Sequence, residues 1–127
     1  MKAAMFASTD LTPTPGEGIS GFTHAADREI QVSRPVGAED AEQFDRGNRV
    51  YRVAFKVSRY FTSLLDADTF VTGHPDAIFD IGKADLKLTK EDDSFATLSN
   101  ALGSAAITRH DGLSVEIQYV FSGGPWA

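Results

Sequence analysis

The fold of this chain is decided by one stretch of alternating residues, NRVYRVAFKVSRY, at positions 48–60. One face of that stretch carries Tyr51, Val53, Phe55 and Val57, and the other carries Arg52, Ala54, Lys56 and Ser58. Apolar residues at every second position are typical of a β-strand with one buried face. The stretch therefore predicts a strand at Asn48–Tyr60, in a sheet that covers a core on one side.

Weaker alternation on either side of this stretch predicts further strands. They are expected at Arg28–Arg34, Ala84–Thr89, Ser94–Ser99, Ser104–His110 and Leu113–Phe121. The last two form a hairpin around Asp111-Gly112, which is a turn signal. We interpret 37–47 as a polar loop and Asn100–Gly103 as a bend.

One helix is predicted at residues 63–73. Ser63 is suited to cap its N-terminus, with Asp66 three residues further on. Gly73 can end it in a left-handed conformation, and Pro75 is expected to block its continuation. His74 is then expected to lie in a solvated loop.

These elements predict an α+β fold, mainly an antiparallel β-sandwich or partial barrel of about six strands with one flanking helix. A chain of 127 residues fits one domain. We expect an irregular N-terminal arm at 1–27, which contains a Pro-rich run, then a single β-rich domain at 28–122. Residues 123–127 are expected to form a flexible C-terminal tail.

The composition excludes several classes of protein. Apolar residues make up 42% and aromatic residues 10%, too many for a wholly disordered chain. There is no cysteine, so disulfides and thiolate chemistry are excluded. No apolar run has the length of a membrane span or of a signal-peptide core. We therefore expect no membrane insertion and a chain that is cytoplasmic when made.

The charge is unevenly distributed. A net charge of −6 argues against direct nucleic-acid recognition, because phosphate binding needs a cationic surface. Residues 47–62 nevertheless carry four bases, Arg49, Arg52, Lys56 and Arg59, and no acid. Two interpretations are open: the basic strand pairs with acidic neighbouring strands, or it is a docking stripe for an acidic partner.

No set of residues predicts catalysis, a cofactor or a metal. The letters G-x-G-x-x-G at 16–21 lack the preceding strand and following helix that a dinucleotide site requires. His24, His74 and His110 are far apart and have no carboxylate at metal-ligand spacing. His110-Asp111 beside Ser114 sits in a turn, where triad geometry is rare, and the acids at 91–93 lack calcium-loop spacing. We expect a protein that is not an enzyme.

Two aromatic residues are candidates for an interface. Trp126 follows a Gly-Gly-Pro stretch and either folds back on its own core or anchors in a neighbouring subunit. Tyr60, with Val50 and Val120, falls on the outer face of its strand. This predicts a second covered surface, formed by the N-terminal arm or by another chain. The interface candidates are therefore Arg49, Arg52, Lys56, Arg59, Tyr60 and Trp126.

The stretch 48–124 resembles a family of small bacteriophage and prophage tail-associated proteins. The resemblance rests on the alternating strand with Phe55, Val57, Arg59 and Phe61, on the Ser-capped helix and on His74-Pro75 after it. It ends with Gly112-Leu113-Ser114-Val115 and the run Tyr119-Val120-Phe121-Ser122-Gly123-Gly124. Residues 1–47 take no part in it.

The resemblance implies a structural role in a virion tail, after assembly in the bacterial cytoplasm. The protein would form a homo-oligomeric ring, or act as an adaptor between tail components, with copies of itself and other tail proteins as partners. A ring of acidic subunits would also line a channel that DNA passes without sticking. The alternatives are a small-molecule-binding module or enzyme with a pocket in a curled β-sheet, and a regulatory adaptor that docks through the basic strand.

Overall fold

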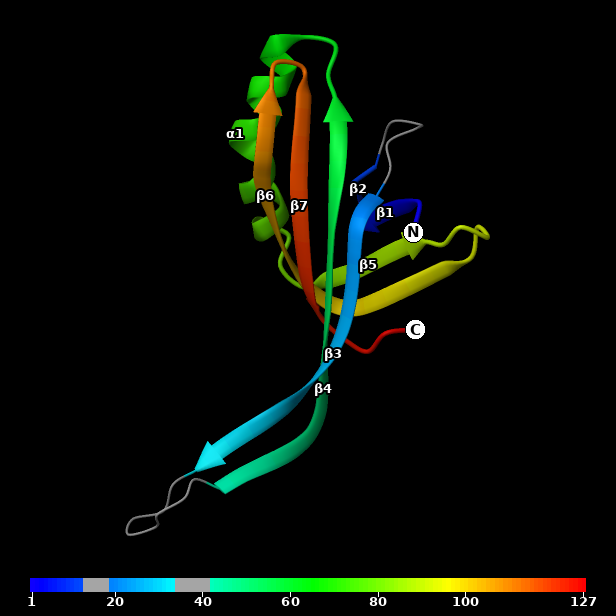
Figure 1. The fold of residues 1–127 in the computed structure, drawn as a ribbon, viewed down its shortest axis with the longest axis vertical. Coiled ribbons are helices and arrows are strands. Elements are labelled where there is room, and N and C mark those ends of the chain that lie inside the picture. The colour runs from blue at the N-terminus through cyan, green and yellow to red at the C-terminus, as the bar shows by residue number, and fades with distance from the viewer. Residues whose placement is uncertain (13–18, 34–41) are drawn as a thin grey trace.

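A computed structural model describes residues 1–12, 19–33 and 42–127, and side chains within 27–49 lie outside that description. The described residues form seven strands and one helix (Figure 1). In chain order these are β1 Ala3–Phe6, β2 Thr9–Asp10, β3 Ile19–Ser33, β4 Glu42–Tyr60, α1 Leu64–Asp80, β5 Ala84–Thr89, β6 Phe95–Asp111 and β7 Ser114–Gly123. The predicted α+β fold, mainly antiparallel with one flanking helix, is confirmed.

The strands form one curled sheet in the order β2-β1-β5-β6-β7-β4-β3, and every neighbouring pair is antiparallel. The curl comes from β6. Its first part, as far as Ala101, pairs with β5, and its second part, from Leu102 on, pairs with β7. The bend that was expected at Asn100–Gly103 therefore lies inside a continuous strand, and β5 runs across the direction of β4 and β7 (Figure 1).

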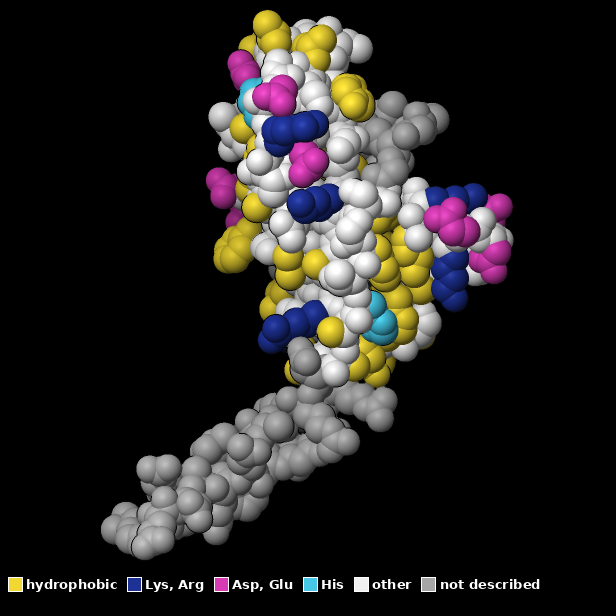
Figure 2. Space-filling view, viewed as in Figure 1, with side chains coloured by type: hydrophobic (Ala, Val, Ile, Leu, Met, Phe, Trp, Pro, Cys, Tyr) yellow, Lys and Arg dark blue, Asp and Glu magenta, His cyan; other side chains and the backbone are white. Residues whose placement is uncertain are grey.

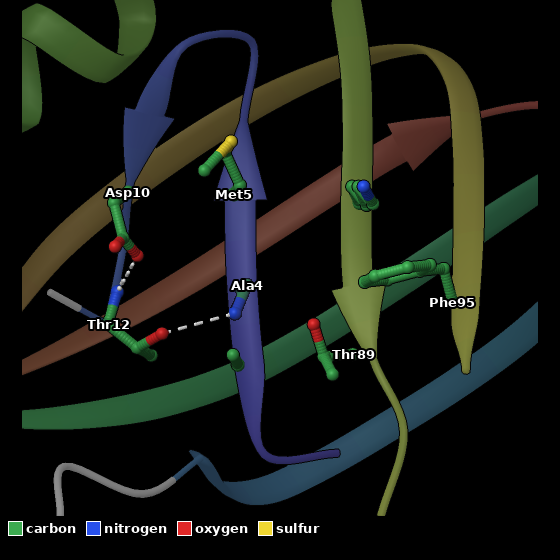
Figure 3. A pocket seen from close by; sticks show the side chains of 8 residues that line it. Ala4, Met5, Asp10, Thr12, Thr89 and Phe95 are labelled. Atoms are coloured by element: carbon green, nitrogen blue, oxygen red, sulfur yellow. Dashed lines mark hydrogen bonds between the residues drawn. The ribbon is translucent and has the colours of Figure 1, made fainter. Parts of the chain in front are cut away.

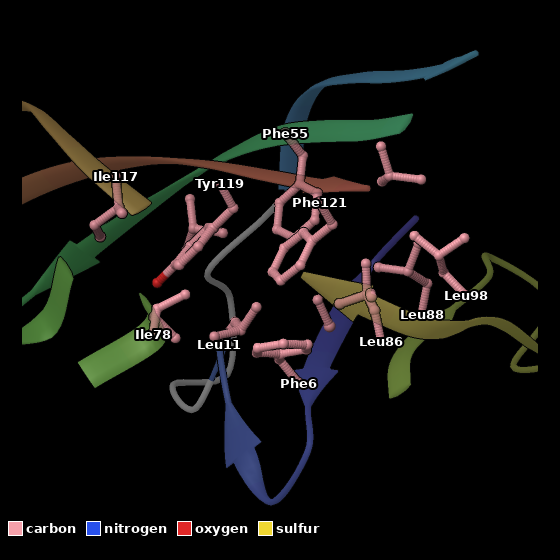
Figure 4. Packing of buried hydrophobic residues seen from close by; sticks show 14 of the residues in the cluster. Phe6, Leu11, Phe55, Ile78, Leu86, Leu88, Leu98, Ile117, Tyr119 and Phe121 are labelled. Atoms are coloured by element: carbon pink, nitrogen blue, oxygen red, sulfur yellow. The ribbon is translucent and has the colours of Figure 1, made fainter. Parts of the chain in front are cut away.

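The core fills the concave side of this curl (Figure 4). Phe6 of β1 and Phe121 of β7 have ring centroids 4.9 Å apart, although β5 and β6 separate their strands in the sheet. Phe55 of β4 lies against the same Phe121 ring, at 5.8 Å. The predicted inward faces of the strongest strands are confirmed, since Val53, Phe55, Val57, Leu86, Leu88 and the alternate residues Val115–Phe121 are fully buried.

The start of α1 agrees with the sequence. The Ser63 hydroxyl accepts a hydrogen bond from the Asp66 backbone N–H at 3.1 Å, as an N-cap does. The helix packs against β6 and β7 through the fully buried Ala67. No helix in the described part of the chain has the length and apolar character needed to cross a bilayer.

The predicted end of the helix is wrong. The helix does not stop at Gly73 but continues through Pro75 to Asp80. A proline inside a helix costs about 3 kcal/mol, and burying an isoleucine contributes about 1.5–3 kcal/mol. Ile78 is 1% exposed. Its burial beyond Pro75 offsets most of that cost and keeps the last turn helical.

The prediction of an irregular arm at 1–27 is also wrong for the residues that the structure describes. That segment contains β1, β2 and the first nine residues of β3. Phe6 and Leu11 are buried in the core, which explains why this short segment is ordered. The strand expected at 28–34 therefore begins earlier, at Ile19, and β4 begins at Glu42, inside the predicted loop at 37–47. Residues 37–41 of that loop lie outside the described part.

The C-terminal tail is not free. Ala127 and Thr97 exchange two backbone hydrogen bonds, of 2.9 and 2.8 Å, and Trp126 forms a bridge with Leu98. The first part of β6 pairs with β5 on one side. On its other side it has bent away from β7, and residues 125–127 pair there instead. The prediction of a flexible tail failed because this pairing is created only by the bend.

The end of β7 passes very close to that bend. A Cβ added to Gly123 would lie 2.6 Å from the Asn100 carbonyl oxygen and 2.8 Å from the Ala101 Cα. We expect Gly123→Ala to lower the free energy of unfolding by about 1–3 kcal/mol, because backbone atoms cannot yield as a side chain can. Urea unfolding followed by circular dichroism measures this.

Gly73→Ala is the matched control. Its added Cβ meets nothing within 4 Å in the exposed part of α1, so we expect stabilisation by about 0.5–1 kcal/mol. Equal stability of the two variants would contradict this description of the bend.

Candidate assembly surfaces

The first candidate surface is a two-stranded ribbon. β4 pairs with β7 only over Tyr51–Tyr60, so β3 is the only partner strand of Glu42–Val50 among the described residues. We call the paired segments 27–33 and 42–50 the ribbon. It leaves the rest of the sheet and extends away from it (Figure 1), over about 30 Å at the usual rise of a strand.

The second surface is the outer edge of β3. β3 ends the sheet order, and no strand in the described residues pairs with its outer side. A row of unpaired N–H and C=O groups is a template for pairing with another chain. Register shifts between Ser20 and Thr23 and between Arg28 and Ile30 divide this edge into shorter regular segments.

The four bases of the basic strand do not share one environment. Arg49 lies in the ribbon, where its side chain is outside the description, and Arg52 is exposed. Lys56 lies 3.8 Å from Glu116 of β7, as expected for pairing with an acidic neighbour strand. Arg59 is half-buried, with its guanidinium 4.6 Å from the Phe70 ring of α1. Figure 2 shows basic side chains separated by acidic and uncharged ones, so a continuous stripe is absent from this face of the described residues.

A third surface lies where β4 ends. Tyr60, Leu64, Leu65 and Leu113 are 69%, 61%, 74% and 41% exposed. The Phe61 N–H donates to the Leu113 carbonyl at 2.9 Å, which holds the end of β4 beside the β6–β7 turn. We call these four residues the tip. Clustered apolar side chains exposed at one end are typical of an interaction surface.

The fourth surface is a hollow on the outer side of β1, β2 and β5 (Figure 3). Its volume is about 170 Å³, and it is lined by Ala3, Ala4, Met5, Asp10, Thr12, Lys87, Thr89 and Phe95. Asp10 accepts a hydrogen bond from the Thr12 N–H at 3.0 Å, and the Lys87 ammonium lies 3.8 Å from the centre of the Phe95 ring. The hollow is smaller than the usual pocket for a cofactor or drug-sized ligand, about 300–1,000 Å³.

Trp126 packs on its own chain. Its ring stacks on His24 of β3 with centroids 4.9 Å apart, and His24 stacks in turn near Tyr51 at 6.1 Å. Of the two alternatives for this residue, the structure therefore has the one in which it folds back.

His74 lies in α1 and not in a solvated loop, which corrects the sequence prediction. Its Nε2 is 2.6 Å from the Tyr119 hydroxyl, and its ring stacks on Phe70 at 4.3 Å. Tyr119 is fully buried. Burial, and next the positive charge of Arg59, lower the pKa of His74 to about 4. The pair joins the helix to the sheet, and sequence patterns missed it because the residues are 45 positions apart.

The other histidines have separate surroundings. His110 lies 3.7 Å from the Asp68 carboxylate and 3.1 Å from the Gly112 carbonyl. The described residues contain no group of three or more His, Cys, Asp or Glu side chains that could hold a metal ion.

Several solved structures are similar to this chain. No protein-family model matches the chain, and no curated protein matches it. A solved structure of the tail of an empty GTA particle, with C6 symmetry, is similar over 87% of this chain and 81% of that chain, with 13% identity and a TM-score of 0.45.

The His74–Tyr119 pair predicts a pH-dependent stability. In the unfolded chain His74 has its ordinary pKa near 6.5, and in the folded chain it stays neutral down to about 4. Between these pH values the unfolded state binds a proton that the folded state does not. The contribution of His74 to the free energy of unfolding is therefore fully present above pH 6.5 and is lost as the pH drops towards 4. The slope from this group is at most about 1.4 kcal/mol per pH unit, and water around the half-buried ring lowers it.

We expect His74→Gln to flatten the dependence of melting temperature on pH between 5 and 6.5. Gly73→Ala, which changes the preceding position of α1 but no titratable group, is the control and should keep the shape of the wild-type profile. Identical profiles for wild type and His74→Gln would show that His74 does not titrate as described.

Proposed function

We propose that this protein is a structural component of a phage-like tail, which acts by self-assembly into a homo-oligomeric ring or as an adaptor between tail components. The ribbon is the observation that carries this proposal. An isolated two-stranded ribbon is at best marginally stable in water, and a third strand or another packed surface is needed to support it. Within the described residues, nothing but β3 pairs with Glu42–Val50.

The edge of β3 and the tip support the same proposal. A long unpaired strand edge and an exposed apolar end are both costly in a protein that stays single. The edge runs along β3, whereas the tip lies at the end of β4 and the start of α1 (Figure 1). Contacts made by two different surfaces of each copy lead to rings or stacks, which is the kind of assembly that the family resemblance implies.

The proposal assigns the protein no enzymatic role, no cofactor, no direct recognition of nucleic acid and no membrane insertion. Its place is the virion tail, after assembly in the bacterial cytoplasm, and its partners are copies of itself and other tail proteins. Two of the three histidines, His74 and His110, contact Tyr119 and Asp68 respectively. The hollow is lined by none of them.

Shortening the ribbon tests the proposal. Arg28 and Arg49 are direct partners across the two strands, so an Asn-Gly turn can replace residues 29–48 and close the hairpin at that pair. We expect the wild-type protein to form a defined oligomer at high concentration and the shortened variant to remain monomeric. Light scattering coupled to size exclusion measures the mass, and electron microscopy shows whether rings form.

Gly73→Ala, which retains the ribbon, is the control and should assemble as the wild type does. The melting temperature of the shortened variant verifies that its core is folded. A wild-type chain that is monomeric at every concentration would contradict the proposal, and so would a shortened variant that assembles unchanged.

A further inference from the structure

We infer that the hollow on β1, β2 and β5 binds the Tyr60 side chain of a second copy of this chain. The inference rests on the proposed self-assembly and names one contact within it. Tyr60 projects at the tip, at the end of β4, and is 69% exposed. The hollow lies on another part of the sheet and is separated from β4 by β6 and β7. Tyr60 of one copy therefore meets the hollow of another copy.

The size of the hollow fits one aromatic ring. A cavity of roughly 150 Å³ is known to hold a benzene molecule, and the hollow has about 170 Å³. Its apolar wall consists of alanine, methionine and phenylalanine side chains, with Met5 41% and Phe95 56% exposed (Figure 3). Covering these two side chains removes apolar surface from water, which favours binding at about 25 cal/mol per Å².

The polar groups of the hollow select a tyrosine. Asp10 uses Oδ1 for the Thr12 N–H, and its Oδ2 makes no hydrogen bond within the described residues. A phenolic hydroxyl can donate to that oxygen while its ring covers the apolar wall. Phe79 is also highly exposed, at 74%, but it has no hydroxyl, so its ring would cover the exposed Asp10 carboxylate without giving Oδ2 a donor.

The charges near the two surfaces are complementary. Lys87 lines the hollow and makes no ion pair within the described residues. The first two turns of α1, which begin with Leu64 and Leu65 of the tip, carry the exposed carboxylates of Asp66 and Asp68. Opposite charges on facing surfaces orient two proteins during association, so the acidic start of α1 is expected to lie beside Lys87 of the next copy.

This contact is heterologous. Each copy that donates its Tyr60 still has an empty hollow, and each copy that fills its hollow still has a free Tyr60. Such contacts propagate until the ends meet in a ring or continue as a filament. A two-fold dimer would instead use the same surface on both copies.

The absence of cysteine from the chain makes cross-linking a direct test. The probe is Ser94→Cys, at an exposed residue directly before Phe95 of the hollow, combined with Thr62→Cys, two residues after Tyr60, treated with a short bismaleimide. We expect the double variant to give a ladder of dimer, trimer and larger species on a denaturing gel. A mixture of the two single variants should stop at the dimer, because each chain then carries one thiol.

Adding Tyr60→Ala to the double variant should reduce the ladder about tenfold or more, as loss of a buried aromatic anchor does. Tyr60→Phe should reduce it less, since the ring remains. Phe79→Ala, at an equally exposed aromatic residue away from the tip, is the matched control and should leave the ladder unchanged.

An unchanged ladder in the Tyr60→Ala variant would overturn the inference. If light scattering showed that the wild-type chain, which has no cysteine, still assembled, the proposed function would stand without this contact. If that chain stayed monomeric, the proposed function and the contact would fall together.

Discussion

The bend of β6 at Asn100 is the constraint on which the rest of the structure depends. Asn100 has φ 51°, in the left-handed region that asparagine tolerates better than most residues. Before the bend β6 pairs with β5, and after it with β7. This change of partner turns β1 and β5 across the sheet and brings Phe6 onto Phe121. It also opens the strand edge that the C-terminal residues fill, and it requires a residue without a side chain where Gly123 passes the bend.

Local sequence signals predicted the elements that depend on local chemistry. The alternation at 48–60, the strand Ala84–Thr89, the β6–β7 hairpin and the Ser63 cap were all found from residue spacing. In the hairpin, the two turn residues are Gly112 and Leu113, with Gly112 at φ 60°, which is a small shift from the expected Asp-Gly turn. The elements that were missed have long-range causes. β1 and β2 have four and two residues, too few for a periodic signal, and their order comes from the burial of Phe6 and Leu11.

The same division applies to the candidate surfaces. Tyr60 was found because strand alternation places it on an outer face, whereas the hollow was missed because Met5 and Asp10 belong to a segment that was predicted to be irregular. The His74–Tyr119 pair was missed because His74-Pro75 has the composition of a helix end. The local sequence around His74 contains no signal for a contact with the Tyr119 hydroxyl on a distant strand. Only the packing of α1 on β6 and β7 creates that contact, and the same packing places the Arg59 guanidinium over Phe70.

In the proposed assembly, the ribbon and the Tyr60 contact have different tasks. Pairing through backbone groups gives affinity, but it accepts many sequences and many registers, because every strand presents the same N–H and C=O groups. A ring needs one fixed angle between copies, since an error at each contact accumulates around the circle. A single aromatic side chain in a hollow of matching size and polarity fixes both position and register, because a shift of one residue would leave Oδ2 of Asp10 without the tyrosine donor. In this chain the register shifts along β3 limit pairing of its edge with unrelated strands. A side-chain contact is therefore the element that can select the correct neighbour.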